Sequence, residues 1–148
     1  MVELNIPTQD IDVKIIESKN YIFDLIKKKY LILTPEEWVR QNLVRYFIND
    51  LNYPKGLIKT ESSLKYNNLK KRSDILIFNN DMTHFLVVEC KSYKLKLNKS
   101  HISQSAMYNK IYKSKYVMIS NGLDHIVCKY DWNNDSFEFM KSIPKYRN

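Results

Sequence analysis

Apolar residues alternate with polar ones along much of the chain, or form short β-branched runs separated by breaks rich in Asn, Asp and Lys. This pattern is typical of β-strands joined by turns. Residues 34–51 differ, because their apolar side chains recur at helical spacing. A Thr at 34, Pro at 35 and Glu at 37 predict a helix start with an N-cap and a capping box.

The other expected elements follow in chain order. Alternation over residues 11–16 predicts an edge strand or an arm, and residues 21–33 predict a hairpin. Strands are expected after the first helix over 57–66, 72–78 and 83–91, then a helix over 101–112, then strands over 116–119, 125–130 and 136–140. Asn121-Gly122 predicts a tight hairpin turn with positive φ. The pattern is that of an α/β protein with a mixed sheet.

Two of these strands, 72–78 and 83–91, flank Asn79-Asn80-Asp81-Met82 and predict an antiparallel hairpin. With a turn at Asp81 and Met82, Asn80 pairs with Thr83, and Asp74 then lies directly opposite Glu89. Because side chains alternate along a strand, Lys91 falls on the Glu89 face and Cys90 on the other.

Two opposed carboxylates destabilise a sheet unless a positive charge lies between them, and a divalent metal ion would supply it. A simpler hypothesis fits these residues about as well: Glu89 forms an ion pair with Lys91, and Asp74 caps a strand. Glu37 also has two interpretations. Completion of the capping box is favoured, and the alternative is that Glu37, or less plausibly Glu36, reaches the metal site.

Charge adds a class of partner to this picture. The chain of 148 residues, one domain's worth, has 24 Lys and Arg against 16 Asp and Glu, a net charge of +8 that favours a polyanion. Lys94 and Lys96 are expected to continue the strand that ends in Lys91 and to face a phosphate backbone. No apolar run approaches the roughly 18 residues of a membrane span, so the expected location is the cytoplasm. Cys90 and Cys128 lack Cys-x-x-Cys spacing and are expected to be reduced core thiols.

Five short stretches, in this order, resemble the N-terminal nuclease domain of type I restriction enzyme R subunits, which belongs to the PD-(D/E)XK nuclease superfamily. They are Thr34–Gln41, Lys71–Leu76, Val87–Lys91, Gln104–Asn109 and Ser120–Leu123. The resemblance implies a restriction-endonuclease-like α-β-β-β-α-β core over residues 35–148. Residues 1–34 would form an N-terminal arm and accessory β-hairpin packed on that core.

The resemblance also implies roles for single residues. Asp74 and Glu89 would bind Mg²⁺, with Mn²⁺ as an alternative ion, and Lys91 would be the catalytic lysine. Gln104 and Tyr108 would form the motif that this branch adds beside the active site. The substrate would be DNA, and the candidate contacts to it are Lys71, Arg72, Lys94 and Lys96.

The sequence departs from a full R subunit in two respects. A Walker A loop needs two glycines near a Lys, and the chain has only Gly56 and Gly122, so no ATP motor fits these residues. Ser73 replaces the proline that usually precedes the first Asp. Translocation and target recognition would therefore come from another chain, such as a translocase or specificity subunit, or would not occur. Formation of a homodimer stays an open alternative. The alternative function is a non-cleaving nucleic-acid-binding or assembly module on the same fold.

Overall fold

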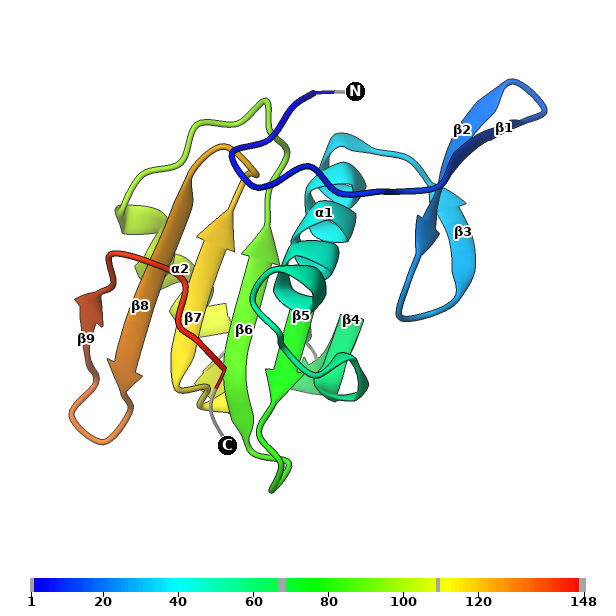
Figure 1. Cartoon of the computed structure of the whole chain (residues 1–148). Coiled ribbons are helices and arrows are strands. Elements are labelled where there is room, and N and C mark those ends of the chain that lie inside the picture. The colour runs from blue at the N-terminus through cyan, green and yellow to red at the C-terminus, as the bar shows by residue number, and fades with distance from the viewer. Residues whose placement is uncertain (1, 67–68, 109, 147–148) are drawn as a thin grey trace.

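The computed structural model describes residues 2–66, 69–108 and 110–146, without the side chains of 61–66, 69–73 and 108. In this part of the chain a six-stranded mixed sheet, a three-stranded antiparallel sheet and two α-helices are present (Figure 1). The predicted mixed α/β fold is confirmed.

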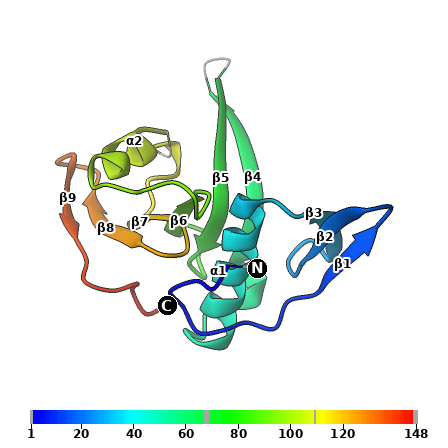
Figure 2. The same cartoon turned by 90° about the horizontal axis from the view of Figure 1, so that it is seen from above.

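The six-stranded sheet has the order β4-β5-β6-β7-β8-β9, with β6 and β7 parallel and the other neighbours antiparallel. Its strands are β4 (Ile58–Tyr66), β5 (Leu69–Phe78), β6 (His84–Cys90), β7 (Tyr116–Ser120), β8 (His125–Asp131) and β9 (Ser136–Phe139). Helices α1 (Pro35–Asn49) and α2 (Ser100–Tyr108) lie on opposite faces of this sheet (Figure 2). Two short 3₁₀ helices, Lys55–Leu57 and Lys110–Tyr112, complete the elements described.

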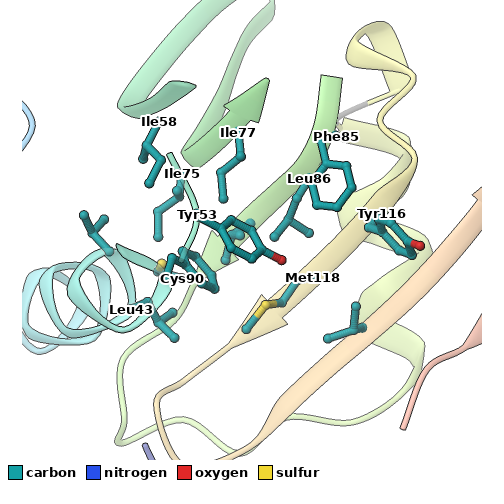
Figure 3. Packing of buried hydrophobic residues seen from close by; sticks show 14 of the residues in the cluster. Leu43, Tyr53, Ile58, Ile75, Ile77, Phe85, Leu86, Cys90, Tyr116 and Met118 are labelled. Carbon is teal, nitrogen blue, oxygen red and sulfur yellow. The ribbon is translucent and has the colours of Figure 1, made fainter. Parts of the chain in front are cut away.

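The first core layer lies between α1 and one face of the sheet. At its centre the Tyr53 ring stacks on Phe47, with 5.2 Å between ring centroids, and meets Phe85 edge-on. Figure 3 shows Tyr53 and Phe85 among the aliphatic side chains of the strands. The buried members are Val39, Leu43, Val44, Phe47, Tyr53, Ile58, Ile75, Ile77, Phe85, Leu86, Val88, Cys90, Tyr116, Met118 and Val127. Each fully buried large side chain contributes roughly 1.5–3 kcal/mol.

The second core layer lies on the α2 face. It contains Leu76, Val87, Leu97, Ile102, Tyr112, Val117, Ile119 and Cys128. Alternation along β6 therefore sends Val87 to this layer and Val88 and Cys90 to the α1 layer, as predicted. Both cysteines are buried and free, which confirms the prediction of core thiols.

The N-terminal residues form the three-stranded sheet β1 (Val13–Ile16), β2 (Lys19–Asp24) and β3 (Lys29–Ile32). The predicted hairpin is β2–β3, and β1 adds the edge strand. This sheet lies beyond α1, at the opposite end of the molecule from β9 (Figure 1). Arg45 Nη2 of α1 donates to the Phe23 carbonyl at 3.0 Å. Because two layers cover α1, it also buries polar side chains, among them Arg40, Gln41 and Arg45.

Several predicted boundaries were wrong. Helix α1 ends at Asn49 and not at Leu51. The β7–β8 connection spans four residues, because Ser120 pairs with His125 and the Asn121 side chain accepts hydrogen bonds from the Leu123 and Asp124 amides. Gly122 does have a positive φ of 84°. No described helix is long and apolar enough to cross a membrane.

Candidate functional site

The β5–β6 ladder sets the position of the predicted carboxylates. Its register is Ile75↔Val88, Leu76↔Val87 and Ile77↔Leu86, and it shifts by one residue before Phe78↔His84. The predicted pairing of Asn80 with Thr83 was wrong, because the Asn79 amide instead donates to the Thr83 carbonyl at 2.8 Å. The shift restores the predicted register beyond it, so the next position in the ladder sets Asp74 against Glu89.

Asp74 is buried and its carboxylate turns toward α1. Its Oδ2 accepts the backbone N–H of Cys90 at 2.8 Å, and its Oδ1 lies 3.4 Å from Arg40 Nη1. Arg40 also donates through Nε to Glu37 Oε2 at 2.9 Å and through Nη2 to Glu37 Oε1. Arg40 therefore bridges two buried carboxylates, a role that was not predicted. These three side chains are called the Arg40 cluster below.

The helix start explains why Glu37 takes part. Thr34 Oγ1 accepts the Glu37 backbone N–H at 3.0 Å, which confirms the predicted N-cap. The Glu37 carboxylate, however, accepts from Arg40 and from Gln41 Nε2, at 2.9 Å in the latter case. It therefore does not complete the predicted capping box, since the guanidinium three residues on offers a charged, forked donor. The spacing Glu37 to Arg40 was a usable signal.

The Arg40 cluster lines a cleft of about 380 Å³ together with Leu31, Ile32, Thr34 and Glu36. Asp74, Glu37 and Glu36, which were all considered as metal ligands, thus share one opening between β3, α1 and β5.

Glu89 and Lys91 line a second cleft, at the end of β6 beside α2. Glu89 Oε2 lies 2.9 Å from Lys91 Nζ, and the two side chains are 21% and 38% exposed. The cleft measures about 280 Å³ and is lined by Glu89, Lys91, Leu95, Lys96, Leu97, His101 and Gln104. The structure therefore brings Gln104 to Glu89 and Lys91, whereas the Tyr108 side chain is outside the described part.

The environment of Lys91 links the two clefts. Partial burial lowers the pKa of Lys91, but the hydrogen bond to Glu89 and the charges of Glu89, Glu36 and Asp74 outweigh it and raise that pKa overall. Lys91 is therefore an ammonium group at neutral pH. Full burial, reinforced by the charge of Asp74, raises the pKa of the Cys90 thiol well above its ordinary value, so Cys90 is not a nucleophile.

The predicted DNA contacts have mixed outcomes. Lys94-Leu95-Lys96-Leu97 does not continue the strand, because β6 ends at Cys90 and Ser92 closes a turn by accepting the Lys94 and Leu95 amides. Lys96 lines the Glu89 cleft, and Lys94 is exposed on the turn. Lys71 and Arg72 lie on β5 opposite Leu64 and Ser63, with side chains outside the described part.

The three histidines have different surroundings. His84 Nδ1 lies 2.8 Å from the Tyr112 carbonyl oxygen, and His125 Nδ1 lies 2.8 Å from Ser120 Oγ, so both are structural. His101 lines the Glu89 cleft and was not predicted as a site residue. No signal in the sequence separates it from the other two.

The donor chemistry of Asp74 and Glu89 fits a divalent ion, since Mg²⁺ prefers hard carboxylate oxygens. In the structure a protein cation holds each of them, Arg40 at Asp74 and Lys91 at Glu89. No group of three or more His, Cys, Asp or Glu side chains within residues 2–66, 69–108 and 110–146 is arranged to hold a metal ion.

Comparison with known proteins identifies a family and similar solved structures. The family described as Type I restriction enzyme R protein N terminus (HSDR_N) matches residues 35–144. The fragment structure of a putative HsdR subunit of a type I restriction enzyme from Vibrio vulnificus YJ016 is similar with a TM-score of 0.42 and 20% identity, over 60% of this chain and 19% of that chain. This chain thus spans about a fifth of that protein's length. No curated protein matches.

Proposed function

The chain belongs to the family of the type I restriction enzyme R protein N terminus, and from that premise we propose that it is a metal-dependent nuclease domain that hydrolyses phosphodiester bonds in DNA. The observation that carries this proposal is the Glu89–Lys91 ion pair at the end of β6, in a cleft with Gln104 and within the electrostatic reach of Asp74. In metal-dependent phosphodiester hydrolysis, carboxylates hold the metal ion and a cationic side chain can stabilise the negative charge on the phosphate.

On this proposal α1, β4–β7 and α2 form a PD-(D/E)XK core, within a domain of residues 35–148 on which residues 1–34 pack as an accessory unit. Translocation and target recognition would come from a translocase or specificity subunit on another chain, or would not occur. We place DNA along the exposed Lys94, along Lys96 and along Lys71 and Arg72 of β5.

Mg²⁺, or Mn²⁺ as an alternative, would supply a Lewis acid for the phosphoryl oxygen and an activated water. Asp74 and Glu89 would hold the ion, and Glu37 is the third carboxylate available to it once Arg40 moves aside. Lys91 is an ammonium group beside Glu89 in this structure, and its proposed role is to stabilise negative charge on the phosphate and to orient the water. The Gln104 amide can donate to a phosphate oxygen at the mouth of the cleft.

The alternative function is a non-cleaving nucleic-acid-binding or assembly module. The observation that favours it is the neutralisation of Asp74 by Arg40 and of Glu89 by Lys91, which leaves both carboxylates compensated without a metal ion. Nicking of supercoiled plasmid in Mg²⁺ and in EDTA separates the two functions. A metal-dependent nuclease nicks the plasmid in Mg²⁺ but not in EDTA. A non-cleaving module binds the plasmid under both conditions and nicks it under neither.

Mg²⁺ is expected to raise the melting temperature of the wild-type protein. At ten times its dissociation constant, an ion that binds only the folded state contributes about 1.4 kcal/mol, a shift of roughly 3–6 °C for a domain of this size. Thermal scans in EDTA and in rising Mg²⁺ measure the shift, and the Asp74→Asn/Glu89→Gln double variant is the control that should not respond. A wild-type melting temperature that changes with neither Mg²⁺ nor Mn²⁺ would contradict the proposed metal site.

DNA binding is expected to weaken steeply with salt, because the proposed interactions join lysine side chains to phosphates. The Lys94→Gln/Lys96→Gln double variant should reduce the slope of log affinity against log salt concentration by about 2, close to one unit for each lysine that no longer neutralises a phosphate. Fluorescence anisotropy with a labelled duplex measures the slope. The matched control is Lys141→Gln/Lys145→Gln, two exposed lysines of the C-terminal segment. Equal slopes in both double variants would contradict the placement of DNA at the Glu89 cleft.

A further inference from the structure

Four aromatic side chains of β8, β9 and their connection form a continuous row, here called the aromatic ladder. Trp132 and Tyr130 stack with ring centroids 4.4 Å apart and planes 21° apart. Tyr130 stacks on Phe137 at 5.1 Å and 22°, and Phe139 meets Phe137 edge-on at 5.5 Å. The β8–β9 register explains the row, because it pairs Tyr130 with Phe137 and Cys128 with Phe139.

The ladder lies on the same face of the sheet as α2 and the Glu89 cleft. Cys128, the cross-strand partner of Phe139, belongs to the core layer under α2, and so do the packed sides of Tyr130 and Trp132. Yet Phe137 is 38% exposed and Phe139 is 43% exposed. Exposed aromatic side chains at the edge of a sheet are available to bind a partner through their ring faces.

Positive charge connects the ladder to the cleft. Lys99 Nζ lies 4.7 Å from the centroid of the Phe139 ring. Lys99 directly precedes α2. Lys96, three residues before it, and His101, two residues after it, line the cleft with Glu89 and Lys91. The stretch 96–99 thus places one lysine at the exposed Phe139 ring and another in the cleft with the proposed catalytic residues.

We propose that the aromatic ladder binds the bases of an unpaired DNA strand whose phosphates follow Lys99 and Lys96 into the Glu89 cleft. Bases stack on aromatic side chains with little regard to sequence, whereas in a duplex their faces are already covered by neighbouring base pairs. The ladder therefore selects single-stranded or locally unpaired DNA as the substrate form. This inference rests on the proposed function for its partner, DNA, but not on cleavage.

A purely structural ladder would only hold β9 against β8. Trp132 Nε1 donates to the Ser114 carbonyl at 2.7 Å, which fixes one end of the row whether or not DNA is bound. A measurement of DNA binding therefore distinguishes a binding role of the ladder from a purely structural one, whereas a measurement of stability does not.

The chain has two tryptophans, so Trp38→Phe leaves Trp132 as a fluorescent reporter within the ladder. In this background a single-stranded oligothymidylate of about 12 nucleotides, within the usual site size, should quench Trp132 fluorescence. Phe139→Leu and Phe137→Leu, which keep apolar bulk and remove the π-face, should each weaken binding of the oligonucleotide between about fivefold and 150-fold. Affinity for a duplex of the same length should change less than about twofold in either variant, because duplex binding is electrostatic.

Phe139→Tyr should retain wild-type affinity, and Met82→Ala, an exposed apolar residue of the β5–β6 turn, is the matched control that should change nothing. Folded Phe139→Leu and Phe137→Leu proteins that bind the oligonucleotide as tightly as the parent would overturn the ladder proposal. If duplex is bound and nicked while the oligonucleotide neither binds nor quenches, the ladder proposal fails and the nuclease stands. If the oligonucleotide binds and quenches Trp132 but no DNA is nicked, the ladder proposal is supported and the nuclease proposal is contradicted.

Discussion

Replacing Glu89 with Gln is expected to lower the rate of Mg²⁺-dependent plasmid nicking by at least about 100-fold. Gln has the shape of Glu without its charge, so the variant keeps the side chain in the cleft and removes one of the two carboxylates proposed to hold the ion. Asp74→Asn should cause a loss of similar size. Lys91→Met should also lose nicking, because it removes the ammonium group that stabilises the phosphate.

The loss of nicking in Glu89→Gln cannot be confused with unfolding. The Glu89–Lys91 pair is partly exposed, and pairs of that kind contribute only about 0–1 kcal/mol to stability. The variant should therefore melt close to the wild-type temperature in EDTA. The affinity of Glu89→Gln for DNA should stay within about twofold, since the phosphate contacts are assigned to cationic side chains, all of which the variant retains.

Cys90→Ala is the matched control, because Cys90 is the chain neighbour of Glu89 but points into the α1 core layer. It should nick at the wild-type rate if it folds. Nicking is measured as conversion of supercoiled to open-circular plasmid over time. A Glu89→Gln protein that nicks as fast as wild type would contradict the assignment of Glu89 as a metal ligand. A folded Cys90→Ala protein that cannot nick would contradict the placement of the active site at the Glu89 cleft.

The sequence predicted the order of the elements and the register that sets Asp74 against Glu89. Both follow from local rules, namely alternation along strands, turn residues and an N-cap, which act over a few neighbouring positions. Even the error at the β5–β6 turn did not propagate, because a one-residue shift between Ile77 and Phe78 restored the register. Gln104 reached the cleft for the same reason, since α2 directly follows β6 in the chain.

What the sequence did not predict depends on contacts between distant segments. The burial of Arg40 and Arg45 requires the N-terminal sheet to cover α1, and a helix pattern alone cannot reveal a second covering layer. The turn at Ser92 ended a strand that Lys94 and Lys96 were predicted to extend, because one side-chain hydroxyl captured a backbone amide. The positive charge beside Asp74 comes from Arg40, a residue 34 positions away in the chain.

The Arg40 cluster gives the second large effect. Arg40→Met is expected to reduce the free energy of unfolding by about 3–5 kcal/mol, the usual cost of removing one partner from a buried ion pair. Arg40 is 4% exposed, and Glu37 and Asp74 are buried as well, so the variant would leave two carboxylates close together in the interior without this guanidinium. Urea denaturation measures the change as a lower midpoint with an unchanged slope.

Arg45→Met is the comparison variant in this experiment. Arg45 is on the same helix and equally well buried, but the acceptors of its hydrogen bonds include the Gln41 side chain and the carbonyls of Gln41 and Phe23. It should lose about 1–3 kcal/mol, the cost of unsatisfied buried polar groups. Adding Glu37→Gln should recover much of the loss in Arg40→Met and none in Arg45→Met.

Mg²⁺ then tests whether the Arg40 cluster and the proposed metal site compete for the same carboxylates. If Arg40 supplies the positive charge that the ion would otherwise supply at Asp74, Arg40→Met should be stabilised by Mg²⁺ more strongly than wild type is, because no guanidinium has to be displaced. Arg45→Met should respond to Mg²⁺ as wild type does. A stability of Arg40→Met within about 1 kcal/mol of wild type would contradict the buried ion pair. A Mg²⁺ response that is equal in all three proteins would show that Asp74 does not exchange Arg40 for the metal ion.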